Sequence, residues 1–345
     1  MTTLAEARRD VRRVAIPSRS RIGFSRGAAH AARWLLRTIA IVVPVFLFAT
    51  FVTFALGTVS GLSPAALKLG DAATKSQERI VNAQFGLDHP LVIRYLNWLG
   101  GAMTGNFGDS WFNGLPVAPQ IFQRLGISVS IAAFALIIGV SAGFALGLLA
   151  TVRRGTWLDR AVTGFATVIS TLPPFVVAIV LIIVFSVTLR WMPSAGYVDP
   201  SVNLGQWLTL ITLPAIALSL DTIADLARQL RTGLVAAYDE NYVTGAIARG
   251  FSPRRVLFVH VLRNGGGPAL AVLGLRAPAL LGGAVVTESI FGMEGFGRFT
   301  SESALRGDVP AVQGALVVGI VLVLGFNVVV NALLARLVPS SRKGN

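Results

Sequence analysis

Six long, mostly apolar windows limit how this chain of 345 residues can fold. They lie at approximately residues 38–60, 127–151, 161–189, 207–234, 268–290 and 311–337. A helix needs about 20 apolar residues to cross about 30 Å of hydrocarbon, and each window reaches that length. Because lipid offers no hydrogen-bond partners, windows of this length cross it as helices. The pattern predicts an all-α polytopic membrane protein with six transmembrane helices.

The composition supports this class, since 54% of the residues are hydrophobic and 13% are charged, whereas soluble domains carry about 25% charged residues. The net charge of +14 comes from arginines beside the apolar windows rather than from a basic groove with interleaved aromatic residues, so no nucleic-acid partner is expected. Cysteine is absent, which excludes disulfides and thiolate chemistry. His30, His89 and His260 are far apart in sequence, and no metal site is expected.

The distribution of basic residues predicts the orientation. Lysine and arginine concentrate in the N-terminal tail, between the second and third windows, between the fourth and fifth, and after the sixth. Basic residues favour the cytoplasmic side, so both termini are expected to be cytoplasmic. Residues 1–33 are expected to form an Arg-rich arm in solvent or on the lipid surface, 34–61 a retained first helix, and 338–345 a cytoplasmic tail.

The connection over residues 62–126 is far longer than the other external connections, which predicts a small external subdomain. Within it, residues 90–99 space their apolar side chains as an amphipathic helix does. A cap on the membrane helices and a docking surface for a partner are both compatible with this pattern. Residues 127–337 are expected to hold helices two to six, with a cytoplasmic segment at 238–264.

Small residues predict where the helices approach one another. Gly139, Gly143 and Gly147 recur every four residues on one face of the second window, and Gly282 and Gly283 lie together in the fifth. Helices in lipid associate through such faces because backbones can pack closely there. The alternative role for these glycines is a moving gate or the wall of a path.

Four charged residues inside windows are candidates for a polar translocation path or gate. Asp221 and Asp225 share one face of the fourth window, and Arg276 and Glu288 lie in the fifth. In hydrocarbon, a charged side chain that is neither paired nor hydrated costs about 3 kcal/mol on membrane-insertion scales. Internal pairing, for instance of Asp225 with Arg228, is the alternative, and the sequence leaves both open.

The segment between the fourth and fifth windows predicts two short helices. The first is expected to end at Arg249, with Gly250 as an elbow. Ser252 and Pro253 then supply an N-cap and a first helical residue. The second helix combines arginines with apolar residues, which suits either a groove of another protein or a membrane surface.

This segment resembles the cytoplasmic EAA-type loop of ABC importer permeases, in the form found in the dipeptide/oligopeptide family. It departs from that pattern at Asn241, Thr244, Gly245 and Ile247, and it lacks the glutamate that names the motif. The matching residues are Tyr242, Val243, Ala246, Ala248, Gly250, Arg255, Val256, Leu257, His260, Leu262, Arg263 and Asn264. The residues that the resemblance assigns to ATPase coupling are Tyr242, Ala246, Ala248, Gly250, Arg254, Arg255, His260 and Arg263.

The resemblance extends over most of the chain beyond about residue 33, and it favours the subunit with the long first external loop. Residues 338–340 read Val-Pro-Ser where the family usually has Asp-Pro-Arg. Further matches lie at residues 85–91, 95–101, 105–110, 282–291, 295–298, 308–310 and 312–314.

The resemblance implies a permease subunit of an ATP-driven importer in a prokaryotic inner (plasma) membrane. The implied partners are a second, nonidentical permease, two cytoplasmic ABC ATPases, an external peptide-binding protein and a peptide cargo. The chain has no GxxxxGK[ST] loop, so it is expected to be no enzyme and to bind no cofactor, with ATP and Mg on the ATPases. Dipeptides, longer peptides, glutathione-like molecules and chelated nickel are all cargoes of similar permeases.

A self-sufficient secondary transporter is the alternative function. It would couple transport to a gradient through the same intramembrane acids, and it typically shows inverted sequence repeats. No such repeat is visible in the sequence.

Overall fold

The computed structural model describes residue 40 and residues 42–58, 74–84 and 87–337. The predicted N-terminal arm, the predicted C-terminal tail and parts of the predicted first helix and external subdomain lie outside the described residues. The chain divides into two units, residues 1–49 and 50–345. In the first unit, residues 42–49 are helical and form the start of a helix that spans Val42–Thr58. The second unit contains every other described element.

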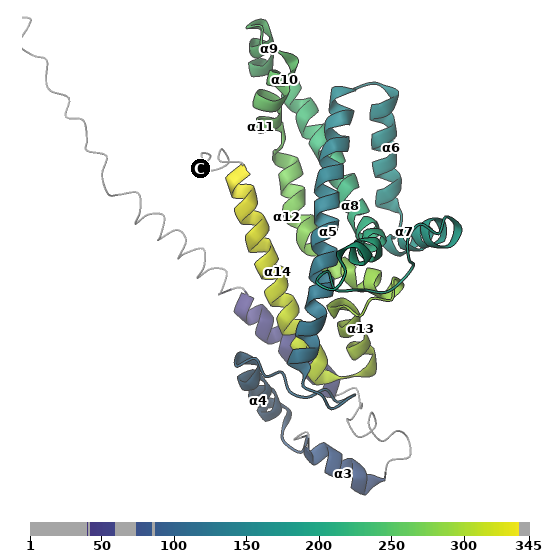
Figure 1. The fold of residues 1–345 in the computed structure, drawn as a ribbon. Coiled ribbons are helices and arrows are strands. Elements are labelled where there is room, and N and C mark those ends of the chain that lie inside the picture. The colour runs from purple at the N-terminus through teal and green to yellow at the C-terminus, as the bar shows by residue number, and fades with distance from the viewer. Residues whose placement is uncertain (1–39, 41, 59–73, 85–86, 338–345) are drawn as a thin grey trace, which may run out of the picture. The chain divides into compact units, whose positions relative to one another are not determined.

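The elements of the described residues are all helices, with no strand among them, which confirms the all-α fold class (Figure 1). After Val42–Thr58 the longer elements follow in chain order. They are α3 (Lys75–Gln84), α4 (Leu91–Met103), α5 (Val117–Val152), α6 (Trp157–Thr171), α7 (Pro174–Leu181), η2 (Ile182–Thr188), α8 (Leu204–Tyr238), α9 (Asn241–Ala248), α12 (Gly267–Ile290), α13 (Phe296–Arg306) and α14 (Val309–Leu337). The short turns α10 (Pro253–Arg255), η3 (Val256–Val261) and α11 (Leu262–Gly265) lie between α9 and α12.

Each of the six apolar windows coincides with helical structure, but the described helices do not all qualify as complete spans. Three are long and apolar enough to cross a membrane: α5, α8 and the Val309–Val330 part of α14. Two bent pairs raise this number to five if each pair is one span. Val42–Thr58 and Pro278–Ile290 are shorter apolar helices.

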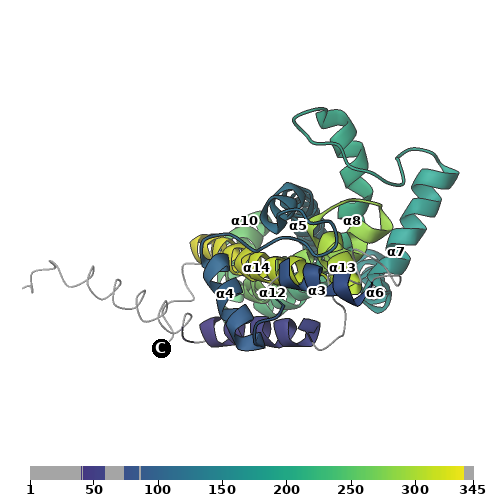
Figure 2. The ribbon, with the colours of Figure 1, turned by 90° about the horizontal axis from the view of Figure 1, so that it is seen from below.

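The third window is broken sharply. α6 ends at Thr171, and the α7–η2 helix that follows it is turned by 108°. Pro173 and Pro174 cause the break, since Pro174 occupies the first position of α7 and a residue before proline avoids helical geometry. Figure 2 shows α7 at one edge of the group of helices, on the far side from α14.

Helix α5 begins earlier than the apolar pattern suggested. Its first residue is Val117, so the expected boundary at residue 126 falls inside a continuous helix. Gln120 and Arg124 interrupt the apolar run, but glutamine and arginine are good helix formers and do not end a helix. The first turns of α5 therefore carry polar side chains.

Helices α5 and α8 pack closely along most of their lengths (Figure 1). An added Cβ at Gly143 would lie 2.9 Å from Leu226 Cβ, and one at Gly147 would lie 2.9 Å from the backbone oxygen of Ala227. Gly139 faces Thr222 in the same way. Gly283 faces Leu218 of α8, whereas nothing lies within 4 Å of an added Cβ at Gly282. The glycine face of α5 thus sets the distance between the two longest helices.

Two polar contacts connect the first helix to later elements within the second unit. The hydroxyl groups of Thr50 and Tyr95 of α4 form a hydrogen bond of 2.8 Å. Gln313 of α14 donates from Nε2 to the Thr50 carbonyl oxygen at 2.9 Å. These contacts connect α4 and α14 to the C-terminal part of Val42–Thr58.

We predict that Gly147→Leu lowers the stability of the folded chain. The new side chain would meet backbone atoms of α8, and overpacking of this kind costs about 1–3 kcal/mol. The measurement is thermal unfolding in detergent. Gly164→Leu on α6 is the matched control, since nothing lies within 4 Å of an added Cβ there. Equal unfolding temperatures for the two variants would contradict the assigned packing role of Gly147.

Candidate functional site

Residues 238–264 form a compact helical segment with a glycine elbow. α9 ends at Ala248, and Gly250 has φ +78°, in the left-handed region that favours glycine. The Ser252 hydroxyl then accepts the Arg255 N–H at 3.4 Å, and Pro253 starts the next helix. This is the elbow and restart that the sequence predicts. The second helix differs from the expectation, because Val256–Val261 forms a π-helical turn.

This segment is fixed firmly to the C-terminal half of α8. Val243, Ala246, Val256 and Val261 are buried and pack in one cluster with Leu230 and other apolar residues of α8. Gly233 and Gly265 add a backbone contact so close that neither position has room for a Cβ. A displacement of the segment must therefore displace α8 as well.

The opposite face of the 238–264 segment is exposed, apolar and basic. Ile247 of α9 is 57% exposed and Phe258 of η3 is 52% exposed, with Val259 beside it. Tyr242, Ala248, Gly250, Arg254, Arg255 and Arg263 are exposed on the same segment. Ala246 is fully buried, so it holds the segment on α8 and presents no surface to a partner.

Phe251 organises the elbow, although the motif did not single it out. The His260 ring stacks on the Phe251 ring at 5.6 Å with an interplanar angle of 4°. The Arg255 guanidinium lies 4.4 Å from the same ring centroid, and Arg249 lies 5.5 Å from it. His260 Nε2 is buried without a hydrogen-bond partner among the described residues. The sequence signal for this role is an aromatic residue directly after Gly250, the predicted elbow.

A cluster of four charged residues connects α8 to α12. Arg276 donates from Nε to Asp225 Oδ2 at 2.7 Å, and its Nη2 forms an ion pair with the same oxygen. Asp225 also pairs with Arg228. Internal pairing, one of the two alternatives for these residues, is therefore observed for Asp225.

Asp221 differs from Asp225 in its surroundings. Its side chain is 35% exposed, its carboxylate lies 3.8 Å from Arg276 Nη1, and no described residue donates a hydrogen bond to it. It lines a cavity of about 80 Å³ beside the break between α6 and α7. Thr222 lines the same cavity, and its buried hydroxyl has no partner within the described residues. A role of Asp221 in a path stays a prediction.

Glu288 is fully buried and caps the start of α13. Its carboxylate accepts the Arg298 N–H at 2.8 Å and pairs with the Ser128 hydroxyl of α5. Ser128 in turn accepts the Phe296 N–H at 2.9 Å. The predicted candidate for a path or gate thus joins α5, α12 and α13 in this structure, and it exposes no surface.

Asp159 is also a buried carboxylate, and it was not singled out from the sequence. The Asp159 carboxylate, at the start of α6, accepts hydrogen bonds from Arg231 Nη2 of α8 at 2.7 Å, from Arg231 Nε, and from the Gly155 N–H at 3.0 Å. Its position three residues after Thr156, at a helix start, was the available signal. No group of three or more histidine, aspartate or glutamate side chains in the described ranges has the arrangement of metal ligands.

Comparison with known proteins identifies the family. Residues 139–343 match the model of the binding-protein-dependent transport system inner membrane component, and residues 31–132 match the N-terminal model of the same membrane components. The chain belongs to this family. It is an ABC transporter permease, as the resemblance of its motifs predicted.

Three relatives show how far the similarity extends. The probable peptide ABC transporter permease protein y4tP of Sinorhizobium fredii is 34% identical over 304 residues, covering 88% of this permease and 95% of that protein. The oligopeptide transport system permease protein AppB of Bacillus subtilis is 29% identical, covering 89% and 98%. The dipeptide transport system permease protein DppB of Escherichia coli is 29% identical, covering 90% and 98%.

A solved structure shows the same fold. A chain of the inward-facing MetNI methionine ABC transporter matches 63% of this permease and 96% of its own length, with a TM-score of 0.51 and 14% identity. At this identity the likeness concerns the fold alone. The family match and the apolar helices make the permease a multi-pass inner membrane protein, and the solved structure shows the ABC transporter permease fold.

We predict that Asp225→Asn destabilises the permease more than Asp221→Asn does. The first change leaves Arg228 and Arg276 without their carboxylate, and removal of one partner from a buried pair costs about 3–5 kcal/mol. Because the Arg276 side chain is 36% exposed, we expect the lower end of that range. Thermal unfolding of both variants, and of each combined with Arg276→Gln, measures the coupling. Additive effects of Asp225→Asn and Arg276→Gln would show that the pair does not join α8 to α12.

Proposed function

We propose that this permease is one of two unlike membrane subunits of an ATP-driven importer of short peptides. The observation that carries the proposal is the 238–264 segment, with one face buried on α8 and the other exposed, apolar and basic. The names and near-complete coverage of the peptide permeases among its relatives support the cargo class.

The length of α8 favours a soluble partner over lipid for the exposed face. Its 35 residues extend for about 52 Å at 1.5 Å per residue, whereas the hydrocarbon core is about 30 Å thick. The 238–264 segment follows the end of α8 that carries Arg228 and Arg231, so it would stand beyond the hydrocarbon. Ile247 and Phe258 would then enter a groove of the ATPase, with the arginines at its rim.

The proposed assembly contains two cytoplasmic ABC ATPases, a second permease and an external peptide-binding protein. ATP and Mg bind to the ATPases, and this permease holds no cofactor. Both of its termini would be cytoplasmic, and residues 62–126 would face the binding protein. The basic residues on the side of the 238–264 segment support this orientation.

The contacts of the described helices provide a mechanical route from one end of the permease to the other. Closure of the ATPases would move the 238–264 segment together with α8, because the two share a buried cluster. Asp225 and Arg276 would transmit this motion to α12. Glu288, near the other end of α12, would carry it to α13 and α5. Each step uses a packed or ion-paired contact rather than a flexible loop.

Copurification tests the proposal. The tagged permease is extracted in mild detergent, its partners are identified by mass spectrometry, and the complex is reconstituted for ATP hydrolysis and peptide uptake. Recovery of a second permease and ATPases, with ATP-dependent uptake, supports the importer. A permease that purifies alone and takes up peptide in response to an ion gradient would instead establish the secondary transporter.

We predict that Gly250→Trp uncouples ATP hydrolysis from uptake in the reconstituted complex. Tryptophan would strain the left-handed elbow and turn the docking face. The uptake per ATP should fall at least severalfold, while ATP hydrolysis continues. Gly155→Trp is the matched control, because Gly155 also has positive φ and open space but lies outside the segment. Normal uptake per ATP in Gly250→Trp would remove the elbow from the coupling route.

A further inference from the structure

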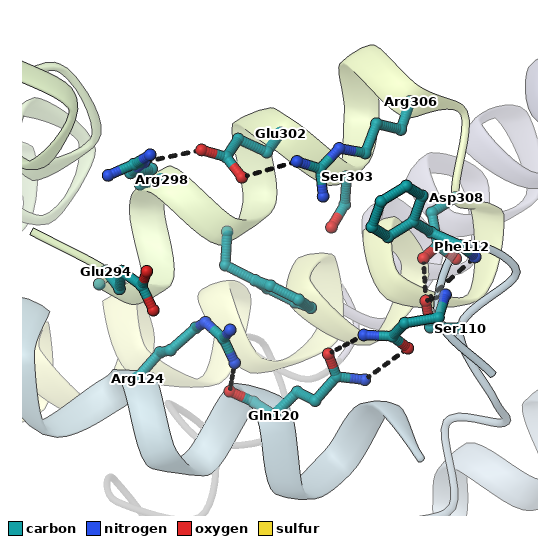
Figure 3. Close-up of a pocket in the computed structure, with 13 residues that line it drawn as sticks. Ser110, Phe112, Gln120, Arg124, Glu294, Arg298, Glu302, Ser303, Arg306 and Asp308 are labelled. Atoms are coloured by element: carbon teal, nitrogen blue, oxygen red, sulfur yellow. Dashed lines mark hydrogen bonds and ion pairs between the residues drawn. The ribbon is translucent and has the colours of Figure 1, made fainter. Parts of the chain in front are cut away.

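A charged cleft of about 220 Å³ lies at the end of the permease opposite the 238–264 segment (Figure 3). Three stretches that are far apart in sequence form it: the turn at residues 110–113, the first turns of α5, and α13 with the residues on either side of it. No prediction from the sequence brought these stretches together. Its charged lining consists of Arg124, Arg298, Arg306, Glu294, Glu302 and Asp308.

The charges in the cleft are unevenly paired. Glu302 accepts from Arg298 Nε at 2.7 Å and from Arg306 Nη2 at 3.3 Å, so these three residues satisfy one another along α13. Asp308 is buried, and its carboxylate accepts hydrogen bonds from the Ser110 hydroxyl and the Trp111 N–H. Arg124 and Glu294 have no ion-pair partner in the part of the chain that the structure describes. The cleft thus contains one available guanidinium and one available carboxylate.

Aromatic rings hold the arginines in position. The Arg124 guanidinium lies 4.9 Å from the centroid of the Phe299 ring, and Arg306 lies 4.2 Å from that of Phe112. Arg124 donates one hydrogen bond, from Nη1 to the Gln120 carbonyl oxygen at 3.0 Å. A guanidinium has five N–H donors, so most of those on Arg124 remain available to a ligand. Figure 3 shows Arg124 and Glu294 on the same side of the cleft.

Charge and size together define the ligand class. Three arginines and three acids line the cleft, so no net charge favours a simple anion or cation over a molecule that carries both charges. A volume of 220 Å³ corresponds to about seven waters at about 30 Å³ each. It lies below the range of about 300–1,000 Å³ for drug-sized ligands. A small zwitterion meets both conditions, and a free dipeptide is such a molecule.

We propose that this cleft binds a short peptide by its two charged ends, with Arg124 taking the α-carboxylate and Glu294 the α-ammonium group. The inference rests on the proposed function, because it names the site where the permease would take up a peptide from the binding protein. Arg298, Glu302 and Arg306 form the preorganised wall of the site. A site that recognises only the termini accepts many side chains but selects against peptides with blocked ends.

The experiment measures peptide binding to the whole complex without its binding protein, in lipid nanodiscs, by isothermal titration. The probes are alanyl-alanine, its N-acetyl form and its C-terminal amide. The variants are Arg124→Gln and Glu294→Gln. Arg79→Gln on α3 and Asp88→Asn before α4 are the matched controls, because both residues are exposed and lie outside the cleft.

Each end of the peptide should depend on one residue. In the unaltered complex, each blocked probe should bind about tenfold or more weakly than alanyl-alanine, as expected for loss of a charged hydrogen bond. Glu294→Gln should abolish the penalty for N-acetylation only, and Arg124→Gln the penalty for amidation only. A merely structural role would weaken all three probes equally, and this outcome would overturn the proposal.

Two further outcomes separate the inference from the proposed function. If the unaltered complex takes up peptide with ATP but both cleft variants bind the three probes as it does, the inference fails and the importer stands. If the variants weaken binding of the external binding protein and leave peptide binding unchanged, the cleft is a protein-docking surface and the inference is wrong. If the unaltered complex neither binds nor transports any peptide, the proposed function fails, and the inference fails with it.

Discussion

A charged group buried among helices must find its partner inside the protein, and this constraint shapes the permease more than any other. Three buried or nearly buried carboxylates meet it by joining helices. Asp159 connects α6 to α8, Asp225 connects α8 to α12, and Glu288 connects α12 to α5 and α13. Each bridges elements that are distant in sequence, so the acids act as crosslinks in an environment where apolar contact gives helices little preference for one another.

The glycine contacts and the polar crosslinks hold different helices together. Gly139, Gly143 and Gly147 let α5 and α8 approach until their backbones almost touch, which keeps that pair together. The ion pair of Asp225 and Arg276 connects α12 to α8 beside a small cavity, and Gly283 and Glu288 connect α12 to α8 and α5 farther along. A close backbone interface resists sliding, and the polar contacts hold α12 to the same two helices. In the proposed transport cycle, α5 and α8 would move as one body, and α12 would follow them through these contacts.

Local signals in the sequence predicted much of this structure. The apolar windows placed the helices, Gly250 with Ser252 and Pro253 placed the elbow, and the motifs identified the family. The early start of α5 was missed because a helix that leaves the membrane no longer needs apolar residues. Most partners of Asp225, Asp159 and Glu288 could not be predicted from the sequence. They depend on the rotation of one helix against another, which no single window of sequence encodes.

In the candidate sites, too, local features could be predicted from the sequence and contacts between distant stretches could not. Tyr242, Arg254 and Arg263 are exposed where the motif led us to expect a docking face, since a short amphipathic segment shows its outer side in its own periodicity. Ala246 belongs to the motif but faces α8, because one motif encodes both the attachment and the exposed face. The cleft at Arg124 and Glu294 gave no signal, since three separate stretches build it.

The contact between Glu288 and Gly295 has a consequence for how sequences of this family diverge. The carboxylate occupies the space where a side chain at residue 295 would begin. A substitution at Gly295 is therefore compatible with the capped α13 only if the acid becomes shorter or withdraws, and loss of the acid makes the glycine dispensable. The two positions should covary among homologues, and a replacement at one of them indicates a rebuilt cap rather than neutral drift.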